Sequence, residues 1–257
     1  MSTYVVTGAA SGIGLVTAEI LTGRGHRVLG VDLAGSDIDA DLSTPAGRTS
    51  MVDQVSERTD GRIDAIVACA GLSSPTVATV RVNYYGAVAT LEGLRPLLAG
   101  SPAPRAVAVT SMASLFPPDK TLLSLLLDGT EDEAVTRAAE LAAGDLAGQI
   151  YGTSKRALAL WLRRRASAPE WAGAGIPLNA VAPGVIDTPM VTDLIATEEA
   201  RIALLQQVPM PLNGIARPEV VGNLIAWLTG EENTHLCGQV VFVDGGSDVV
   251  LRGASTW

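Results

Sequence analysis

Short apolar runs alternate with longer segments of helical character along the chain. Several runs, such as Ile63-Asp-Ala-Ile-Val-Ala-Cys-Ala-Gly71, are nearly continuous in apolar residues, which is typical of strands buried in a parallel sheet. The alternation predicts an α/β fold with a doubly wound, seven-stranded parallel sheet in a single domain over residues 1–257. The predicted strands are 4–7, 27–32, 38–42, 63–71, 105–111, 176–184 and 238–246.

A glycine-rich turn follows the first strand. Tyr4-Val-Val-Thr7 leads into Gly8-x-x-x-Gly12-Ile13-Gly14, and residues 15–22 form a predicted helix. Glycines let the backbone approach a pyrophosphate, and the first N–H groups of the helix are free to bind it. The order strand, glycine loop, helix therefore predicts a dinucleotide site on a Rossmann fold, with a simple turn as the alternative.

The second predicted strand ends in an acid, Asp32, which falls 18 residues after Gly14. A carboxylate at about this position can accept both hydroxyls of an adenosine ribose. It would repel a 2′-phosphate, and Leu33 supplies no cation to attract one. Asp32 and Leu33 together predict NAD as the cofactor rather than NADP. The alternative is that Asp32 is an aspartate of a surface turn without a role in cofactor binding.

Tyr151 and Lys155 lie four positions apart at the start of a predicted helix that continues to Arg163. This spacing puts the phenol and the ammonium on one helix face. A nearby cation favours phenolate, so a tyrosine placed this way can exchange a proton near neutral pH. The spacing alone is a weak signal, because many helices contain it by chance.

Composition narrows the function classes. Hydrophobic residues make up 47% of the chain and charged residues 18%, and the net charge is −9. An acidic chain without clustered cations is not expected to bind nucleic acid. Cys69, Cys237, His26 and His235 are isolated, so we expect neither a metal site nor a disulfide framework.

The chain shows neither of the sequence features that direct a protein to or across a membrane, a signal peptide and a long apolar segment. The N-terminus has no basic stretch followed by an apolar one, and no apolar run reaches the ~18 residues that span a bilayer. We therefore expect a cytoplasmic protein without membrane partners.

Five separated elements together resemble the short-chain dehydrogenase/reductase family. They occur in the family's order and rough spacing over nearly the whole chain: Thr7-Gly8-x-x-x-Gly12-Ile13-Gly14, Asn83, Ser111, Tyr151-x-x-x-Lys155 and Pro183-Gly184. The chain departs from the usual pattern at Ala68-Cys69-Ala70-Gly71, where the family has Asn-Asn-Ala-Gly. The departure affects the hydrogen bonds expected within the sheet, not the catalytic positions.

The resemblance implies roles for the matching residues. Tyr151 would be the acid/base, and Ser111 would stabilise the substrate oxygen. Lys155 would bind the nicotinamide ribose and, together with the positive oxidised nicotinamide, lower the pKa of Tyr151. Asn83 would hold a water that links Lys155 to solvent. With these, the residues expected at the cofactor are Gly8, Ser11, Gly12, Ile13, Gly14, Asp32, Leu33, Asp41, Leu42, Ala70, Gly71, Pro183, Gly184, Ile186 and Thr188.

The segment 114–150 is longer than is usual in the family, and two helices are predicted in it, at 121–127 and 131–143. Such a helical insertion before Tyr151 would obstruct one of the interfaces through which family members form tetramers. We therefore expect a homodimer that uses the helix 218–228 and the last strand. A simple surface cover is the alternative role for the insertion.

Residues 185–212 follow the expected nicotinamide end and form a predicted substrate lid. The apolar residues expected in it are Met190, Val191, Leu194, Ile195, Ile202, Leu204, Leu205, Val208 and Met210, with Leu115 and Phe116 as a further wall. They favour a small apolar ketone or alcohol. Four further stretches, together with the long insertion, most resemble the hydroxysteroid dehydrogenase and carbonyl reductase branch of the family: Ala40-Asp-Leu-Ser-Thr44, Cys69-Ala-Gly-Leu72, Val82-Asn-Tyr-Tyr-Gly86 and Val240-Val-Phe-Val-Asp-Gly-Gly246. This resemblance implies a steroid substrate, and a cyclic or aromatic ketone remains open. An NAD-binding regulatory or scaffold protein on the same fold is the alternative to an enzyme.

Overall fold

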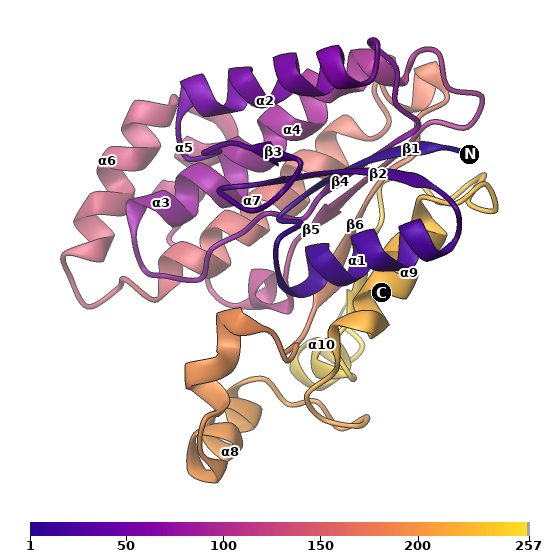
Figure 1. Ribbon diagram of the computed structural model, residues 1–257. Helices are drawn as coiled ribbons and strands as arrows, with labels where there is room; N and C mark the ends of the chain where they lie inside the picture. Colours follow the sequence, from indigo (N-terminus) through magenta and orange to yellow (C-terminus); the bar gives the residue numbers. More distant parts are fainter. Residues whose placement is uncertain (256–257) are drawn as a thin grey trace.

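A seven-stranded parallel sheet forms the centre of the computed structural model, which describes residues 1–255 (Figure 1). The strand order is β3-β2-β1-β4-β5-β6-β7, and every neighbouring pair is parallel. The predicted doubly wound α/β fold is confirmed. The strands are β1 (Thr3–Thr7), β2 (Arg27–Asp32), β3 (Ile38–Asp39), β4 (Ala65–Ala68), β5 (Arg105–Val109), β6 (Leu178–Pro183) and β7 (Val240–Val243).

Several strands end earlier than the apolar pattern predicts, because the chain leaves the sheet where it begins to line a cleft. β4 ends at Ala68, and the next two peptides turn toward the neighbouring strand. The N–H groups of Cys69 and Ala70 both donate to Thr7 Oγ1, each at 3.1 Å. One threonine hydroxyl of β1 thus holds both peptides of this turn.

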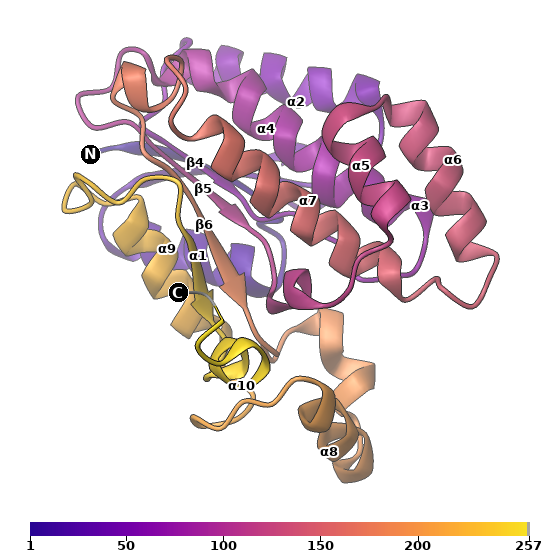
Figure 2. The same ribbon diagram turned by 180° about the vertical axis from the view of Figure 1, so that it is seen from behind.

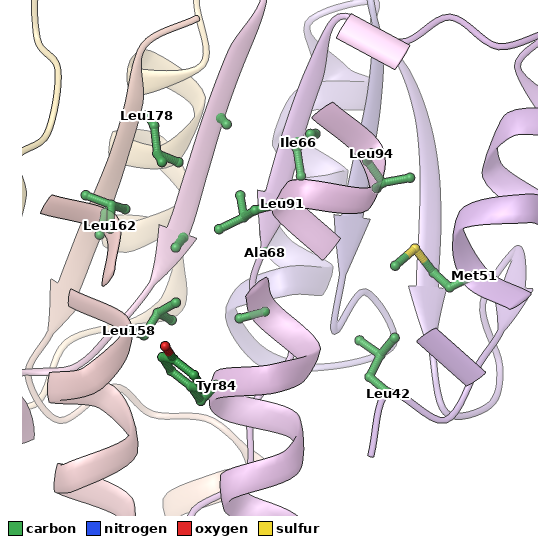
Figure 3. Packing of buried hydrophobic residues seen from close by; sticks show 14 of the residues in the cluster. Leu42, Met51, Ile66, Ala68, Tyr84, Leu91, Leu94, Leu158, Leu162 and Leu178 are labelled. Carbon is green, nitrogen blue, oxygen red and sulfur yellow. The ribbon is translucent and has the colours of Figure 1, made fainter. Parts of the chain in front are cut away.

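Helices cover both faces of the sheet. α1 (Gly12–Gly23) and α9 (Pro218–Leu228) lie on one face (Figure 1). The other face is covered by α2 (Pro45–Arg58), α4 (Ala87–Leu94) and α7 (Gln149–Arg165), as the reverse view shows (Figure 2). On this second face the buried side chains of the helices pack against those of the strands. Figure 3 shows part of this cluster, including Met51, Leu91, Leu94, Leu158 and Leu162 against Ile66, Ala68 and Leu178.

The segment between β4 and β5 is helical throughout but changes its winding. The sequence predicts one helix over residues 80–98. The structure instead has α3 (Val77–Val80), a π-helical stretch η1 (Arg81–Gly86), α4 and a 3₁₀ turn η2 (Arg95–Leu98). The wider π turn contains Asn83, whose side chain is fully buried. π turns inside longer helices frequently mark functional sites.

Two helices precede α7, as predicted. After a 3₁₀ turn η3 (Met112–Leu115) come α5 (Lys120–Asp128), which packs on α7, and α6 (Glu131–Ala142), which lies beside α3 (Figure 2). The Arg48 guanidinium in α2 contacts both carboxylate oxygens of Glu131 at 2.8 Å, and the Tyr85 hydroxyl donates to Thr130 O at 3.3 Å. These bonds join the start of α6 to α2 and η1.

The segment after β6 extends away from the sheet. It contains a 3₁₀ helix η5 (Pro189–Ile195) and α8 (Glu198–Gln207), at the bottom of Figure 1. The remaining elements are a 3₁₀ turn η4 (Ala172–Ala174) before β6 and α10 (Ser247–Arg252) after β7. Within residues 1–255, none of the helices combines the length and hydrophobicity that crossing a bilayer requires.

Candidate active site

A cleft of about 520 Å³ opens at the carboxyl ends of the strands. It lies where the strand order reverses, between β1 and β4, which is the position where open α/β sheets bind their ligands. The structure brings the predicted site residues together here. Every one of them lines the cleft except Asn83, which is buried behind its wall.

The glycine-rich turn is shaped for close approach of a ligand's phosphates. Gly8 has a φ of +73°, and a Cβ atom there would lie 2.9 Å from the Ala70 backbone. A Cβ atom at Gly14 would lie 2.0 Å from the Gly8 carbonyl oxygen. α1 begins at Gly12 with an uncharged first turn, so its first N–H groups and its dipole favour an anion in the cleft.

The end of β2 places a fixed carboxylate at one end of the cleft. Asp32 accepts hydrogen bonds from the N–H groups of Ala10 at 2.9 Å and Leu33 at 2.7 Å. Leu33 is 68% exposed beside it. Hydrogen bonds from Ser43 lower the pKa of nearby Asp41. This end of the cleft is therefore acidic, which disfavours an additional phosphate group.

Ser111 and Tyr151 come from different elements and face the same part of the cleft. Ser111 follows β5 and begins η3, where its Oγ accepts from Ala113 N at 3.1 Å. Tyr151 is in the first turn of α7. Burial raises the pKa of Tyr151, and its hydrogen bond with the Ser111 side chain partly opposes this shift. The phenol is therefore held in its protonated form, next to a hydroxyl that can share its proton.

Lys155 is held by the backbone at the end of β5. Its side chain is only 3% exposed, and Nζ donates to the Val109 carbonyl oxygen at 2.9 Å. Burial lowers its pKa to about 8, so the ammonium can lose a proton not far above neutral pH.

Asn83 organises the wall behind Lys155. Its Oδ1 accepts from Leu72 N at 2.8 Å, and its Nδ2 donates to Leu72 O at 2.9 Å. Nδ2 also lies 3.1 Å from Ser154 Oγ, which in turn donates to Tyr151 O at 2.7 Å. The amide thus connects the turn after β4 with the first turn of the helix that carries Tyr151.

The cleft is apolar beyond Tyr151. Met190 and Val191 line it as expected, whereas Leu194 and Ile202 are 53% and 49% exposed and lie outside its lining. Tyr151 also packs against an apolar cluster that contains other expected residues: Phe116, Leu204, Leu205, Val208 and Met210. Sequence reasoning missed the wall that α3 and η1 supply, namely Ala78 and Val82. The two residues are four positions apart, which puts them on one face of a helix, and this spacing could have indicated the wall.

In the described part of the chain, His, Cys, Asp and Glu residues form no group of three or more that could hold a metal ion.

Comparisons with known proteins agree with the fold and the site. The family described as short chain dehydrogenase matches residues 2–122, and the one described as Enoyl-(Acyl carrier protein) reductase matches residues 134–248. A 3-alpha-hydroxysteroid dehydrogenase/carbonyl reductase of Comamonas testosteroni is 35% identical over 98% of both chains. A cis-4-hydroxycyclohexanecarboxylate dehydrogenase of Sinomonas cyclohexanicum is 32% identical over 96% of both chains.

A solved structure gives the same result. The 3-alpha-hydroxysteroid dehydrogenase from Pseudomonas sp. B-0831, complexed with NADH, superposes with a TM-score of 0.89. It is 36% identical in sequence, and the match covers 98% of this chain and 99% of that one. Identity at this level over the full length shows common descent as well as a common fold. The chain belongs to the short-chain dehydrogenase/reductase family.

Proposed function

We propose that the protein is an NAD-dependent oxidoreductase that interconverts an apolar secondary alcohol and the corresponding ketone. The observation that carries the proposal is the convergence of Ser111, Tyr151 and Lys155 in one apolar cleft, beside a glycine-rich turn and Asp32. The similarity to dehydrogenases and reductases of alcohols and ketones supports it.

The residues of the cleft fit NAD. The glycine turn and the start of α1 suit the pyrophosphate, and the carboxylate of Asp32 suits the hydroxyls of the adenosine ribose. Pro183, Gly184, Ile186 and Thr188 line the part of the cleft where the nicotinamide would lie. When bound, NAD supplies the acceptor or donor of the hydride. The NADH complex of the Pseudomonas enzyme supports this assignment.

The protein's own groups would handle the proton. Tyr151 gives its phenolic proton to the substrate oxygen in ketone reduction and takes it back in alcohol oxidation. The Ser111 hydroxyl donates a hydrogen bond to the same oxygen and stabilises its negative charge. Lys155, with a pKa near 8, is suited to pass protons on and to hold a ribose hydroxyl. Asn83 keeps the helix start and the Gly71–Leu72 turn in register.

A neutral, apolar substrate suits the remaining space. Leu72, Ala78, Val82, Met190 and Val191 line it, and we assign residues 185–212 as the substrate lid. A hydroxysteroid or a cyclic or aromatic ketone can fill such a surface, whereas a sugar would leave its hydroxyls without partners.

Substitution of the tyrosine tests the proposal. Tyr151→Phe removes the proton donor and keeps the ring, so NADH binding should persist while turnover falls by roughly three or more orders of magnitude. Tyr85→Phe is the control, because that hydroxyl bonds Thr130 O outside the cleft. Near-normal activity in Tyr151→Phe would contradict the proposal. Cofactor binding without turnover by the wild-type protein would favour the regulatory or scaffold alternative.

We also propose a homodimer in the cytoplasm. α6 is bonded to α2 and η1, which makes that side of the molecule less available to a second subunit. Exposed apolar side chains on α9 and α10, near edge strand β7, offer the other surface: Val220, Trp227, Val249 and Val250. Two free cysteines, Cys69 and Cys237, are compatible with a reducing compartment.

A further inference from the structure

The chain that leaves β6 meets the chain that returns from α8 at Met210. The Met210 side chain is 7% exposed and packs in an apolar cluster with Val185 and Val208. The Val185 N–H donates a hydrogen bond to Met210 Sδ at 3.2 Å. Methionine usually only fills space in such clusters, and its sulfur is a weak acceptor. Here the sulfur also accepts a hydrogen bond from a buried peptide N–H, so Met210 does more than fill space.

Neighbouring glycines leave room for the thioether. A Cβ atom at Gly184 would lie 3.0 Å from both Sδ and Cε of Met210 and 2.9 Å from Asp244 Cα. A Cβ atom at Gly245 would lie 3.1 Å from Met210 Cβ and 3.3 Å from its Cε. The backbone at Gly184 and at Gly245 therefore packs closely against the Met210 side chain.

Further hydrogen bonds hold the two ends of the 185–212 segment together. Asp187 N donates to Ala216 O at 2.9 Å, and Ala216 N donates to Val185 O at 3.1 Å. Ser247 Oγ donates to Pro209 O at 2.6 Å. By contrast, every residue of η5 and α8 is at least partly exposed. The segment has a tightly bonded base and a lightly packed body, which is the pattern of a unit that opens as a whole.

We infer that Met210 is a positioning residue whose sulfur holds the Val185 peptide and thereby sets the loop from Pro183 to Thr188. The inference rests on the proposed function, because this loop lines the nicotinamide end of the cleft. Met210 acts through the loop and not on the substrate. Without the sulfur, the Val185 N–H would be buried without an acceptor. Conformations of the loop that expose this N–H to water would then become more populated.

Limited digestion with trypsin tests the inference without relying on turnover. Arg201 is the single Lys or Arg between Pro189 and Pro211, and it is exposed in α8. Met210→Leu keeps the apolar volume and removes the acceptor. We expect its cleavage after Arg201 to be roughly ten-fold faster than in the wild type. Met112→Leu is the matched control, because it makes the same change in the same cluster without touching the Val185 N–H.

A second variant separates the hydrogen bond from packing. Met210→Gln restores an acceptor on an unbranched side chain, so its cleavage rate should lie closer to the wild type than that of Met210→Leu. Thermal unfolding followed by circular dichroism checks that each variant folds. The inference is overturned if Met210→Leu is cleaved at the wild-type rate, if Met112→Leu is cleaved as fast, or if Gln is no better than Leu.

Binding of NADH, followed by its fluorescence, adds the functional readout. Met210→Leu should raise the Kd for NADH by roughly ten-fold and change kcat less, because it shifts the loop and leaves Tyr151 in place. An unchanged Kd would contradict the role assigned to the sulfur. If the wild-type protein binds no NADH, the proposed function fails, whereas the digestion result still decides whether Met210 holds the loop.

Discussion

The residue that best shows the conflict between function and stability is Lys155. It is nearly fully buried, and its ammonium has one hydrogen bond, to the Val109 carbonyl oxygen. Burial lowers its pKa from an ordinary value of 10.5 to about 8. Between these two values the unfolded chain binds more protons than the folded protein, so the free energy of unfolding rises with pH in this window. At lower pH the buried charge destabilises the fold.

Lys155→Met should therefore stabilise the protein and inactivate it. The variant removes the buried charge, so at pH 7 it should unfold at a higher urea concentration than the wild type. The difference in free energy of unfolding between the variant and the wild type should shrink by about 2 kcal/mol between pH 7 and pH 9.5, because the wild type recovers stability over this range. Urea denaturation of both proteins at both pH values measures this difference. An equal difference at both would show that the pKa of Lys155 is not lowered.

Asp32 and Leu33 are the two residues that we propose select NAD over NADP. In the double variant Asp32→Ser with Leu33→Arg, the serine hydroxyl can still accept from the backbone, while the arginine can pair with a 2′-phosphate. The ratio of kcat/KM for NADP+ to that for NAD+ should rise by roughly 100-fold or more. Leu33→Ala, which removes the side chain without adding charge, is the control. An unchanged ratio in the double variant would contradict the assignment of this end of the cleft to the adenosine ribose.

Among the elements, α5 and α6 are fixed to α7 through Asp119. Its carboxylate accepts from Leu122 N at 2.7 Å as the N-cap of α5 and pairs with Arg137 of α6 at 2.7 Å. Its N–H donates to Thr153 Oγ1, which lies between Tyr151 and Lys155 on α7. Hydrogen bonds from Arg137 are the main cause that lowers the pKa of Asp119.

Asp119→Ala should lower the free energy of unfolding by about 2–3 kcal/mol at pH 7, because it removes both the cap and the ion pair. Since the folded carboxyl has the lower pKa, this contribution is present above about pH 4 and is lost as the pH falls through the folded value. The difference between variant and wild type should thus shrink in acid. Glu140→Ala is the control, because its pair with Arg137 is exposed and should contribute under about 1 kcal/mol. Equal losses in both variants would refute the argument.

The sequence was informative about elements and much less about contacts. Apolar runs predict all seven strands, and the strand–glycine–helix order predicts where the cleft lies. The π turn at Arg81–Gly86 was not predictable, because it depends on tertiary bonds of Asn83 rather than on local propensity. The partner of Lys155 was missed for a similar reason. Val109 is 46 positions away in the sequence, and no spacing rule relates β5 to α7.

For the whole molecule we predict which surface two copies use to pair. α9 and α10 carry exposed apolar side chains, and Arg252 of α10 lies 5.1 Å over the ring of Phe242 in edge strand β7. Light scattering should give about 53 kDa, twice the 26.5 kDa chain. Val220→Glu with Trp227→Glu should give the monomer, and Leu146→Glu, an exposed leucine elsewhere, should not. A mass near 106 kDa for the wild type would contradict the dimer.

We propose that this cleft oxidises an apolar secondary alcohol with NAD+. The most direct test follows the absorbance of NADH when the protein is mixed with NAD+ and either 3α-hydroxysteroids or simple cyclic alcohols, with NADP+ in parallel. We predict NADH formation with at least one of these alcohols and a clear preference for NAD+. Formation with cyclic alcohols only would keep the mechanism and exclude the steroid. No reaction with any of these alcohols, while the cofactor still binds, would contradict the proposed oxidation.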